Sequence, residues 1–267
     1  MIAALRTAVV TAALAVAGCA ISRTSADLPD IARTWRQAPV TLPALGAADS
    51  LSTTMGTADM TARLARLAGA RLPVVVYLHG CTGIGNFDFF RQLADAGFAV
   101  VAPDSFARRF RPLQCDPATL TGGRNLFVYD FRLEEVDYAL QELWSLPWVD
   151  HGRLFLVGTS EGAVAAALYR GDEFRARVIA QWTCGGAPHV AGLAAPLDEP
   201  VLAIIGADDP WYAAARAAGT PSDCGPLLAG RPDSQSYVVA AGGGHDVFAN
   251  RAATAVIVDF LQRQAMR

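Results

Sequence analysis

Short apolar runs alternate with helix-patterned segments through most of the chain, and this alternation limits the folds available to it. The runs LPVVVYL, FAVV, RLFLV, RVIAQW and VLAII are apolar at nearly every position, which predicts strands buried on both faces. Between them, residues 86–97 and 130–146 show apolar side chains at helical spacing. The pattern predicts an α/β fold with a mainly parallel sheet and helices on both faces. With no internal repeat in view, residues 39–267 are predicted to form a single domain.

Residues 1–18 differ from the rest and are predicted to be an export signal. They contain an apolar run over 8–17 that is shorter than the roughly 20 residues needed to span a bilayer, and the end of this run forms the sequence Val-Ala-Gly directly before Cys19. This ending resembles the lipobox of bacterial lipoproteins. The resemblance implies a mature chain that begins at Cys19 and is anchored to a membrane by lipid, facing the periplasm or the cell exterior. A plain secretory signal or an uncleaved anchor is the alternative. Residues 19–38 are predicted to be a tether.

Charge and residue types exclude several classes of function. The formal net charge is −3, so no basic surface for nucleic acid is predicted. All 22 cationic residues are arginine, which excludes a Schiff-base lysine and a Walker-type phosphate lysine. After export, Cys81, Cys115, Cys184 and Cys224 would lie in an oxidising compartment, where three disulfide pairings are possible. They lack the C-x-x-C spacing of zinc and thiol-redox sites, and no metal or cofactor is expected.

The segment 158–162 reads Gly-Thr-Ser-Glu-Gly and joins an apolar run to an alanine-rich stretch. It matches G-x-S-x-G in the strand–turn–helix context of a nucleophilic serine, Ser160. The flanking glycines would let strand and helix approach while Ser160 adopts a strained conformation that presents its hydroxyl. The alternative is an ordinary helix with Ser160 as its N-cap and Glu161 as an acid favoured by the helix dipole.

Two amides at strand ends are candidates for binding a developing oxyanion. The amide of Glu161 lies at a predicted helix N-terminus, and Cys81 follows a His-Gly pair at the end of the first long strand. We therefore predict an oxyanion hole formed by the amides of Cys81 and Glu161. His79 is predicted to be a packed structural histidine that orients this loop without taking protons.

An acid and a base for the serine also follow predicted strands. Asp208 and Asp209 come after VLAII, and His245 comes after three glycines near a long C-terminal helix. Serine, acid and histidine in this chain order are the catalytic triad of α/β-hydrolases. The alternatives are an Asp-Pro turn and a surface histidine.

Several longer segments resemble the dienelactone hydrolase branch of the α/β-hydrolases over about residues 72–262. They are LHGCTG, GFAVVAPDSFARR, VDHGRLFLVGTSEGA, IIGADDPWY and GGGHDVF, together with Cys115. The resemblance implies the α/β-hydrolase fold and an esterase or lactonase that forms an acyl-enzyme without a cofactor. In this superfamily the acid lies three residues after the glycine that ends its strand, which selects Asp209. Dienelactone hydrolases proper carry a cysteine nucleophile and are cytoplasmic, so the substrate of the namesake enzyme is not carried over.

The same fold predicts how the cysteines pair. Cys81 and Cys115 would follow neighbouring strands, as would Cys184 and Cys224, which predicts disulfides 81–115 and 184–224. The first would fix the oxyanion loop to the segment 104–129.

Arg108, Arg109 and Arg111 lie in that segment, near the expected mouth of the site. They form either a solvated cationic loop or a surface that recruits anionic substrates. The predicted function is a serine hydrolase acting on ester or lactone bonds of a small molecule. The alternatives are a non-catalytic exported binding lipoprotein on the same fold, a peptidase and a polyester depolymerase.

Overall fold

The computed structural model describes residues 28–46, 48–67, 69–187, 189–217, 219, 223–240 and 244–267. The predicted signal peptide and Cys19 lie outside the described residues. Among the helices of the described residues, none is long and apolar enough to cross a membrane.

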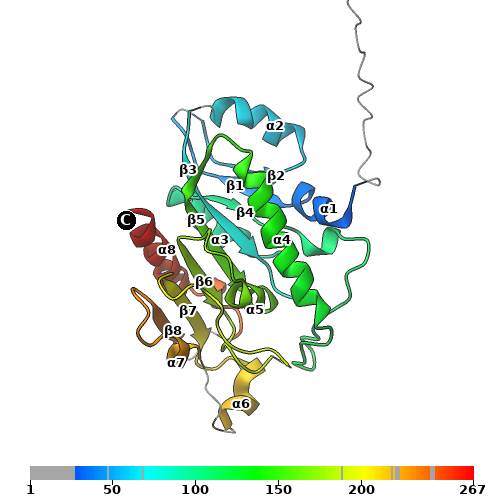
Figure 1. Cartoon of the computed structure of the whole chain (residues 1–267), viewed down its shortest axis with the longest axis vertical. Coiled ribbons are helices and arrows are strands. Elements are labelled where there is room, and N and C mark those ends of the chain that lie inside the picture. The colour runs from blue at the N-terminus through cyan, green and yellow to red at the C-terminus, as the bar shows by residue number, and fades with distance from the viewer. Residues whose placement is uncertain are drawn as a thin grey trace, which may run out of the picture.

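The described strands form one eight-stranded sheet, as the alternating pattern predicts (Figure 1). Strand β1 pairs antiparallel with β2 and β4, and all other pairs are parallel. In sheet order the strands are β2 (Leu51–Thr54), β1 (Pro39–Leu42), β4 (Ala99–Val101), β3 (Leu72–Leu78), β5 (Val149–Thr159), β6 (Ala176–Ala180), β7 (Val201–Gly206) and β8 (Gln235–Val239).

Helices cover both faces of this sheet (Figure 1). The α-helices are α1 (Asp30–Arg36), α2 (Ala58–Leu64), α3 (Phe87–Asp95), α4 (Phe127–Trp144), α5 (Glu161–Leu168), α6 (Ala213–Ala217), α7 (Gly225–Leu228) and α8 (Arg251–Ala265). Short 3-10 helices lie at η2 (Ala65–Leu67), η3 (Ser105–Ala107), η4 (Pro210–Tyr212) and η5 (Val247–Ala249).

The strand β3 shows why its sequence is apolar without a break. Val74 and Val76 pack in a cluster with residues of α4 and α5, whereas Val75 and Tyr77 pack in a cluster with residues of α3 and α8. All four side chains are fully buried. Since successive side chains of a strand point to opposite faces, a strand between two helical layers needs apolar residues at every position.

The predicted tether at 19–38 extends too far, because its last part belongs to the folded domain. Residues 30–36 form α1, and Trp35 of this helix is 8% exposed within the core cluster on the α4 side of the sheet. Arg33 also donates a hydrogen bond from Nε to the carbonyl oxygen of Ala107 at 2.8 Å. The folded domain therefore includes α1, and a tether can extend no further than the start of this helix.

The predicted long C-terminal helix is preceded by a separate short 3-10 helix, η5. Asp246 caps η5 through a hydrogen bond from the Phe248 amide, and the side chain of Asn250 accepts hydrogen bonds from the amides of Ala252 and Ala253. Asn250 is thus a new N-cap, and α8 begins at Arg251.

Two disulfides are present, with the pairing that the sequence predicts. Cys81 is bonded to Cys115, with their Cα atoms 5.9 Å apart, and Cys184 is bonded to Cys224, with their Cα atoms 5.1 Å apart. Such bridges are typical of proteins exported to an oxidising compartment.

Candidate active site

Ser160 sits on the turn between β5 and α5 in a backbone conformation that is rare for a residue with a side chain. Its φ is 53° and its ψ is −115°, and its side chain makes no capping hydrogen bond to the helix. A Cβ on Gly158 would collide with the carbonyl oxygen of Gly162, and a Cβ on Gly162 would collide with that of Leu78. The strain and the close approach therefore favour the presentation of Ser160 over the N-cap alternative.

A hydrogen-bonded relay connects Ser160 to two residues that are distant in sequence. The Nε2 atom of His245 lies 3.1 Å from the Ser160 hydroxyl oxygen, and its Nδ1 atom lies 2.7 Å from Oδ2 of Asp209. Asp209 is fully buried, and its other oxygen accepts a hydrogen bond from the Trp211 amide at 3.0 Å. With Nδ1–H donating to Asp209, Nε2 is left to accept the proton of the serine hydroxyl.

The neighbouring carboxylate, Asp208, has a different hydrogen-bond partner. Oδ1 of Asp208 accepts a hydrogen bond from the backbone amide of Gly244 at 2.8 Å. Beside it, a Cβ on Gly206 would collide with the carbonyl oxygen of Gly244. Asp208 and Gly206 thus position the loop that carries His245, while Asp209 contacts the imidazole itself.

The amides of Cys81 and Glu161 are both close to Ser160. Ser160, Cys81 and Glu161 line one pocket, and a Cβ on Gly80 would lie 3.5 Å from the Cβ of Ser160. Within the described part of the chain, neither of these two amides donates a hydrogen bond to a partner. They are therefore available as a pair of donors beside the serine.

His79 is a structural histidine, as predicted. It is fully buried, its Nδ1–H donates to the carbonyl oxygen of Gly80 at 2.7 Å, and its Nε2 accepts from the amide of Ser105 at 3.1 Å. Burial, with a smaller contribution from the Arg132 guanidinium, holds the pKa of His79 well below its ordinary value of 6.5. The imidazole thus stays neutral and orients the loop that carries Cys81.

A buried charge network beneath this loop was missed by the sequence reasoning. Arg132 of α4 is fully buried and donates hydrogen bonds to Nε2 of His79 at 3.0 Å and to its carbonyl oxygen at 3.1 Å. It also lies 3.1 Å from the Glu135 carboxylate and 3.8 Å from that of Glu161. Arg132 thus connects the loop before Cys81 to the side chain of Glu161, so it ties together the two residues whose amides lie beside Ser160.

Two of the three loop arginines belong to the same network. Arg111 is ion-paired with Glu161, and its side chain is 2% exposed. Arg108 donates to Glu135 at 3.0 Å and is also largely buried. Only Arg109 lies on the surface. The prediction of a solvated cationic loop is therefore wrong for Arg108 and Arg111, and their pairing with buried carboxylates also leaves them unsuited to recruit anionic substrates.

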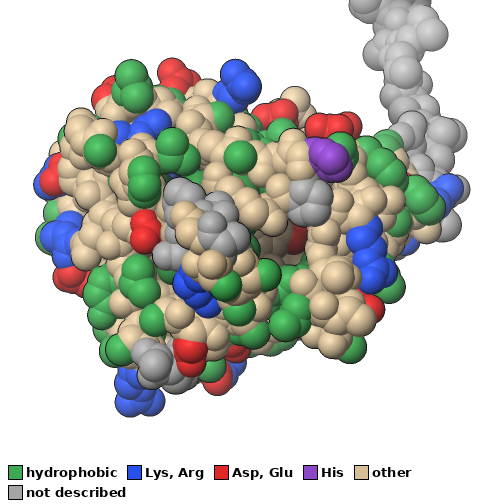
Figure 2. Space-filling view, turned by 90° about the horizontal axis from the view of Figure 1, so that it is seen from below, with side chains coloured by type: hydrophobic (Ala, Val, Ile, Leu, Met, Phe, Trp, Pro, Cys, Tyr) green, Lys and Arg blue, Asp and Glu red, His purple; other side chains and the backbone are tan. Residues whose placement is uncertain are grey.

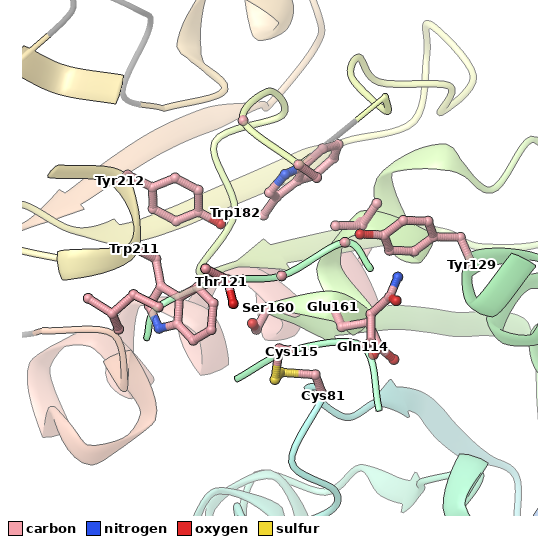
Figure 3. A pocket seen from close by; sticks show the side chains of 16 residues that line it. Cys81, Gln114, Cys115, Thr121, Tyr129, Ser160, Glu161, Trp182, Trp211 and Tyr212 are labelled. Atoms are coloured by element: carbon pink, nitrogen blue, oxygen red, sulfur yellow. A yellow bond between two sulfur atoms is a disulfide. The ribbon is translucent and has the colours of Figure 1, made fainter. Parts of the chain in front are cut away.

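Two pockets meet at Ser160. The first, which we call the aromatic pocket, has a volume of about 300 Å³ (Figure 3). Figure 3 shows Trp211 and Tyr212 on one side of Ser160 and Tyr129 on the other, with the Cys81–Cys115 disulfide next to the serine. The residues that line the aromatic pocket are Cys81, Gln114, Cys115, Leu120, Thr121, Gly122, Gly123, Tyr129, Ser160, Glu161, Val164, Trp182, Gly186, Ala187, Trp211 and Tyr212.

The second pocket, which we call the polar pocket after the side chains of Asn86, His245 and Asp246 in its lining, has a volume of about 450 Å³. It shares Cys81, Leu120, Ser160 and Trp211 with the aromatic pocket. Its other lining residues are Gly80, Thr82, Gly83, Gly85, Asn86, Pro117, Thr159, Gln181, Pro210, His245 and Asp246.

The molecular surface seen from below is hollowed near its middle, and hydrophobic side chains border the hollow (Figure 2). Acidic and basic side chains are scattered over this face rather than gathered into a patch of one sign. Among the described residues, no group of three or more His, Cys, Asp or Glu side chains could hold a metal ion.

Comparison with known proteins places these features in context. A model of the dienelactone hydrolase family matches residues 60–223, which is more than half of the chain. No curated protein matches the sequence.

Several solved structures share the fold at low sequence identity. The crystal structure of esterase PE8 superposes with a TM-score of 0.50 at 21% identity, covering 74% of this chain and 94% of that chain. A hyperthermophilic esterase from the archaeon Pyrobaculum calidifontis has a TM-score of 0.51 at 17% identity, covering 89% and 90%. The protein TT1662 from Thermus thermophilus has a TM-score of 0.50 at 18% identity, covering 74% and 91%. At these identities the likeness concerns the fold alone.

Proposed function

Because the chain belongs to the dienelactone hydrolase family, we propose that it is a serine hydrolase that cleaves carboxylic esters, lactones included, through an acyl-enzyme. The observation that carries the proposal is the relay of hydrogen bonds from Ser160 through His245 to the buried Asp209. A serine hydroxyl is a weak nucleophile until a neighbouring base takes its proton, and the base needs an acid to hold its tautomer and stabilise its positive charge.

In the first half of the reaction, the Ser160 oxygen attacks the ester carbonyl while His245 Nε2 takes its proton. The negative charge that develops on the carbonyl oxygen is bound by the amides of Cys81 and Glu161. His245 then gives its proton to the departing alcohol, and an acyl group remains on Ser160. In the second half, His245 activates a water molecule, which releases the acid and restores the serine.

Covalent labelling tests this proposal directly. A fluorophosphonate probe should label the protein, and the label should disappear in Ser160→Ala. A panel of p-nitrophenyl esters of increasing acyl length should be hydrolysed by the unmodified protein and by no Ser160→Ala preparation. A folded protein that takes up no label and cleaves no ester would instead support the alternative of a non-catalytic binding protein.

We also propose that residues 1–18 are removed and that Cys19 carries the lipid that anchors the protein to a membrane. The lipobox-like ending of the signal supports this proposal, and the two disulfides support export. Mass spectrometry of the membrane-associated protein should find a lipid-modified N-terminal Cys19, and Cys19→Ala should carry no lipid. An unmodified N-terminus elsewhere would support a plain secretory signal.

A further inference from the structure

The two pockets that meet at Ser160 differ in whether the imidazole of His245 lines them. His245 lines the polar pocket and not the aromatic pocket, whereas Ser160 lines both. In the tetrahedral intermediate of the proposed function, on which this inference rests, the leaving oxygen must lie within hydrogen-bond reach of the imidazole that protonates it. The carbonyl oxygen is bound by the two amides, so the acyl chain must take the remaining direction.

We propose that the alcohol part of the substrate occupies the polar pocket and that the aromatic pocket binds an uncharged arylalkanoyl group, so that the protein hydrolyses arylalkanoyl esters of hydroxyl-rich alcohols. The size of the aromatic pocket is suited to such a group. An apolar cavity of about 150 Å³ binds one benzene molecule. The aromatic pocket is about 300 Å³ in volume, which leaves room for a ring and a short linker.

The lining of the aromatic pocket also favours a ring. Trp182, Trp211 and Tyr212 contribute aromatic surface around Ser160, and ring pairs are favourable beyond the area that they bury (Figure 3). The hydroxyl of Tyr212 donates to the carbonyl oxygen of Gln181 at 3.0 Å, so this side chain is held in place. Tyr129 adds a phenol on the opposite side, and burial raises its pKa to about 12, which keeps it neutral. A phenol there can bond a hydroxyl on the bound ring.

The described lining of the aromatic pocket offers no cation to an anionic acyl group. Glu161 is the one charged residue among the residues described as lining it. Arg111 and Arg132 lie beside Glu161, but both are ion-paired with buried carboxylates and neither lines the pocket. A substrate carboxylate would therefore enter this pocket without a cation of its own, and an unpaired charge is costly to remove from water.

The polar pocket offers hydrogen-bonding groups for an alcohol that carries further hydroxyls. Thr82, Asn86, Gln181 and Asp246 line it together with His245. Asn86 donates to the hydroxyl of Tyr77, and Asp246 accepts from the amide of Phe248 at 3.2 Å, so both side chains are oriented. Amide, hydroxyl and carboxylate groups of this kind can form hydrogen bonds with the hydroxyls of glycerol or of a sugar.

A panel of matched esters tests the assignment on the mature, disulfide-bonded protein. The 3-phenylpropanoyl ester of glycerol should exceed both the propanoyl and the succinyl ester of glycerol in kcat/KM by at least tenfold. It should also exceed the n-propyl ester of 3-phenylpropanoate. Equal values for phenylpropanoyl and propanoyl esters, or a preference for succinyl, would overturn the proposal.

Two reciprocal variants test which pocket holds which part. Ala187 lines only the aromatic pocket and Thr82 only the polar pocket. Ala187→Phe should lower the phenylpropanoyl-to-propanoyl ratio of kcat/KM at least tenfold, and Thr82→Val should lower the glycerol-to-propyl ratio instead. A reversed pattern overturns the assignment even though Ser160-dependent hydrolysis is present. The absence of Ser160-dependent hydrolysis from the unmodified protein would remove the proposed function itself, and this inference with it.

Discussion

Arg132 provides a test of how the site is held in shape, because it is not among the described lining residues of the two pockets at Ser160 and yet contacts residues around both proposed oxyanion donors. Its guanidinium donates to the imidazole and the carbonyl of His79, and it lies beside Glu161. We expect Arg132→Met to let the loop before Cys81 move, so that the backbone amide of Cys81 is misplaced in the transition state. Such a change should lower kcat and leave KM nearly constant, because the oxyanion exists only in the transition state.

The size of the effect follows from what is lost. Removal of one oxyanion donor raises the barrier by about 2.7–4 kcal/mol. In Arg132→Met the amide remains but loses its support, so we expect about half of that, which corresponds to a fall in kcat of about 10- to 30-fold.

Arg177 is the matched control. It is as fully buried as Arg132, and it holds Glu199 through hydrogen bonds of 2.7 and 2.5 Å and the carbonyls of Ala166 and Tyr169 at 2.8 Å each. Loss of one partner of such a buried pair costs about 3–5 kcal/mol of stability. Arg177→Met should therefore lower the free energy of unfolding at least as much as Arg132→Met does. In Arg132→Met, the Glu135 carboxylate keeps Arg108 as a partner and the Glu161 carboxylate keeps Arg111.

The assay counts active sites with a fluorophosphonate and reports kcat for each titrated site, well below the melting temperature. We expect Arg177→Met to retain the unmodified kcat and Arg132→Met to lose it as stated. Arg132→Lys, which keeps the positive charge and a single donor nitrogen, should recover part of the loss. If Arg132→Met stays within twofold of the unmodified protein, or if both methionine variants lose the same amount, Arg132 has only a structural role.

Three further outcomes are expected. Asp209→Asn should lower kcat by about 10⁴-fold, as loss of the triad acid does in serine proteases, whereas Asp208→Asn should cost less than about tenfold because its Oδ1 bonds the Gly244 amide rather than the imidazole; equal losses in steady-state kinetics would contradict the assignment. Gly206→Ala should lower the melting temperature and kcat together, because its Cβ collides with the Gly244 carbonyl; an unchanged kcat would argue against that close approach. Because the pKa of His79 is lowered in the fold, the unfolded chain binds a proton there first, so the free energy of unfolding should fall as pH drops below about 6.5, by at most about 1.4 kcal/mol per unit. Urea titrations should show that His79→Gln lacks this slope.

The fold and the hydrogen-bonded relay could be predicted from the sequence, because the residues of each strand show whether it is buried on one face or on both. A strand such as β3, buried on both faces, needs an uninterrupted apolar run, and the polar residue that follows it must lie at the carboxyl edge of the sheet. The choice between Asp208 and Asp209 had no such local signal, and family spacing alone selected Asp209. The structure supplies the physical difference, since the two adjacent carboxylates bond different partners, one Gly244 and the other His245.

Helix α1 illustrates what sequence could not provide. It has only seven residues, in a segment bounded by Pro29 and Pro39, and helices this short are marginal without tertiary contacts. Its stability comes from Trp35, which packs into the core. A single tryptophan in a polar segment does not reveal that partner, so the segment resembled a tether.

The buried charge network could not be predicted from the sequence either, because its members depend on partners that are distant along the chain. Its position beside Ser160 explains why these buried charges are tolerated. Charged side chains are almost never fully buried unless paired, and the partners here, Arg111, Arg132 and Glu161, are tens of residues apart. Glu161 follows the proposed nucleophile, so its carboxylate alone would oppose the negative charge of the oxyanion that its own amide is proposed to bind. Two arginines beside that carboxylate offset its charge, and one of them, Arg132, also holds the loop before Cys81 on the opposite side of the proposed oxyanion hole. Glu161, whose charge alone would weaken the site, thereby helps to hold Arg132, which supports the loop before Cys81.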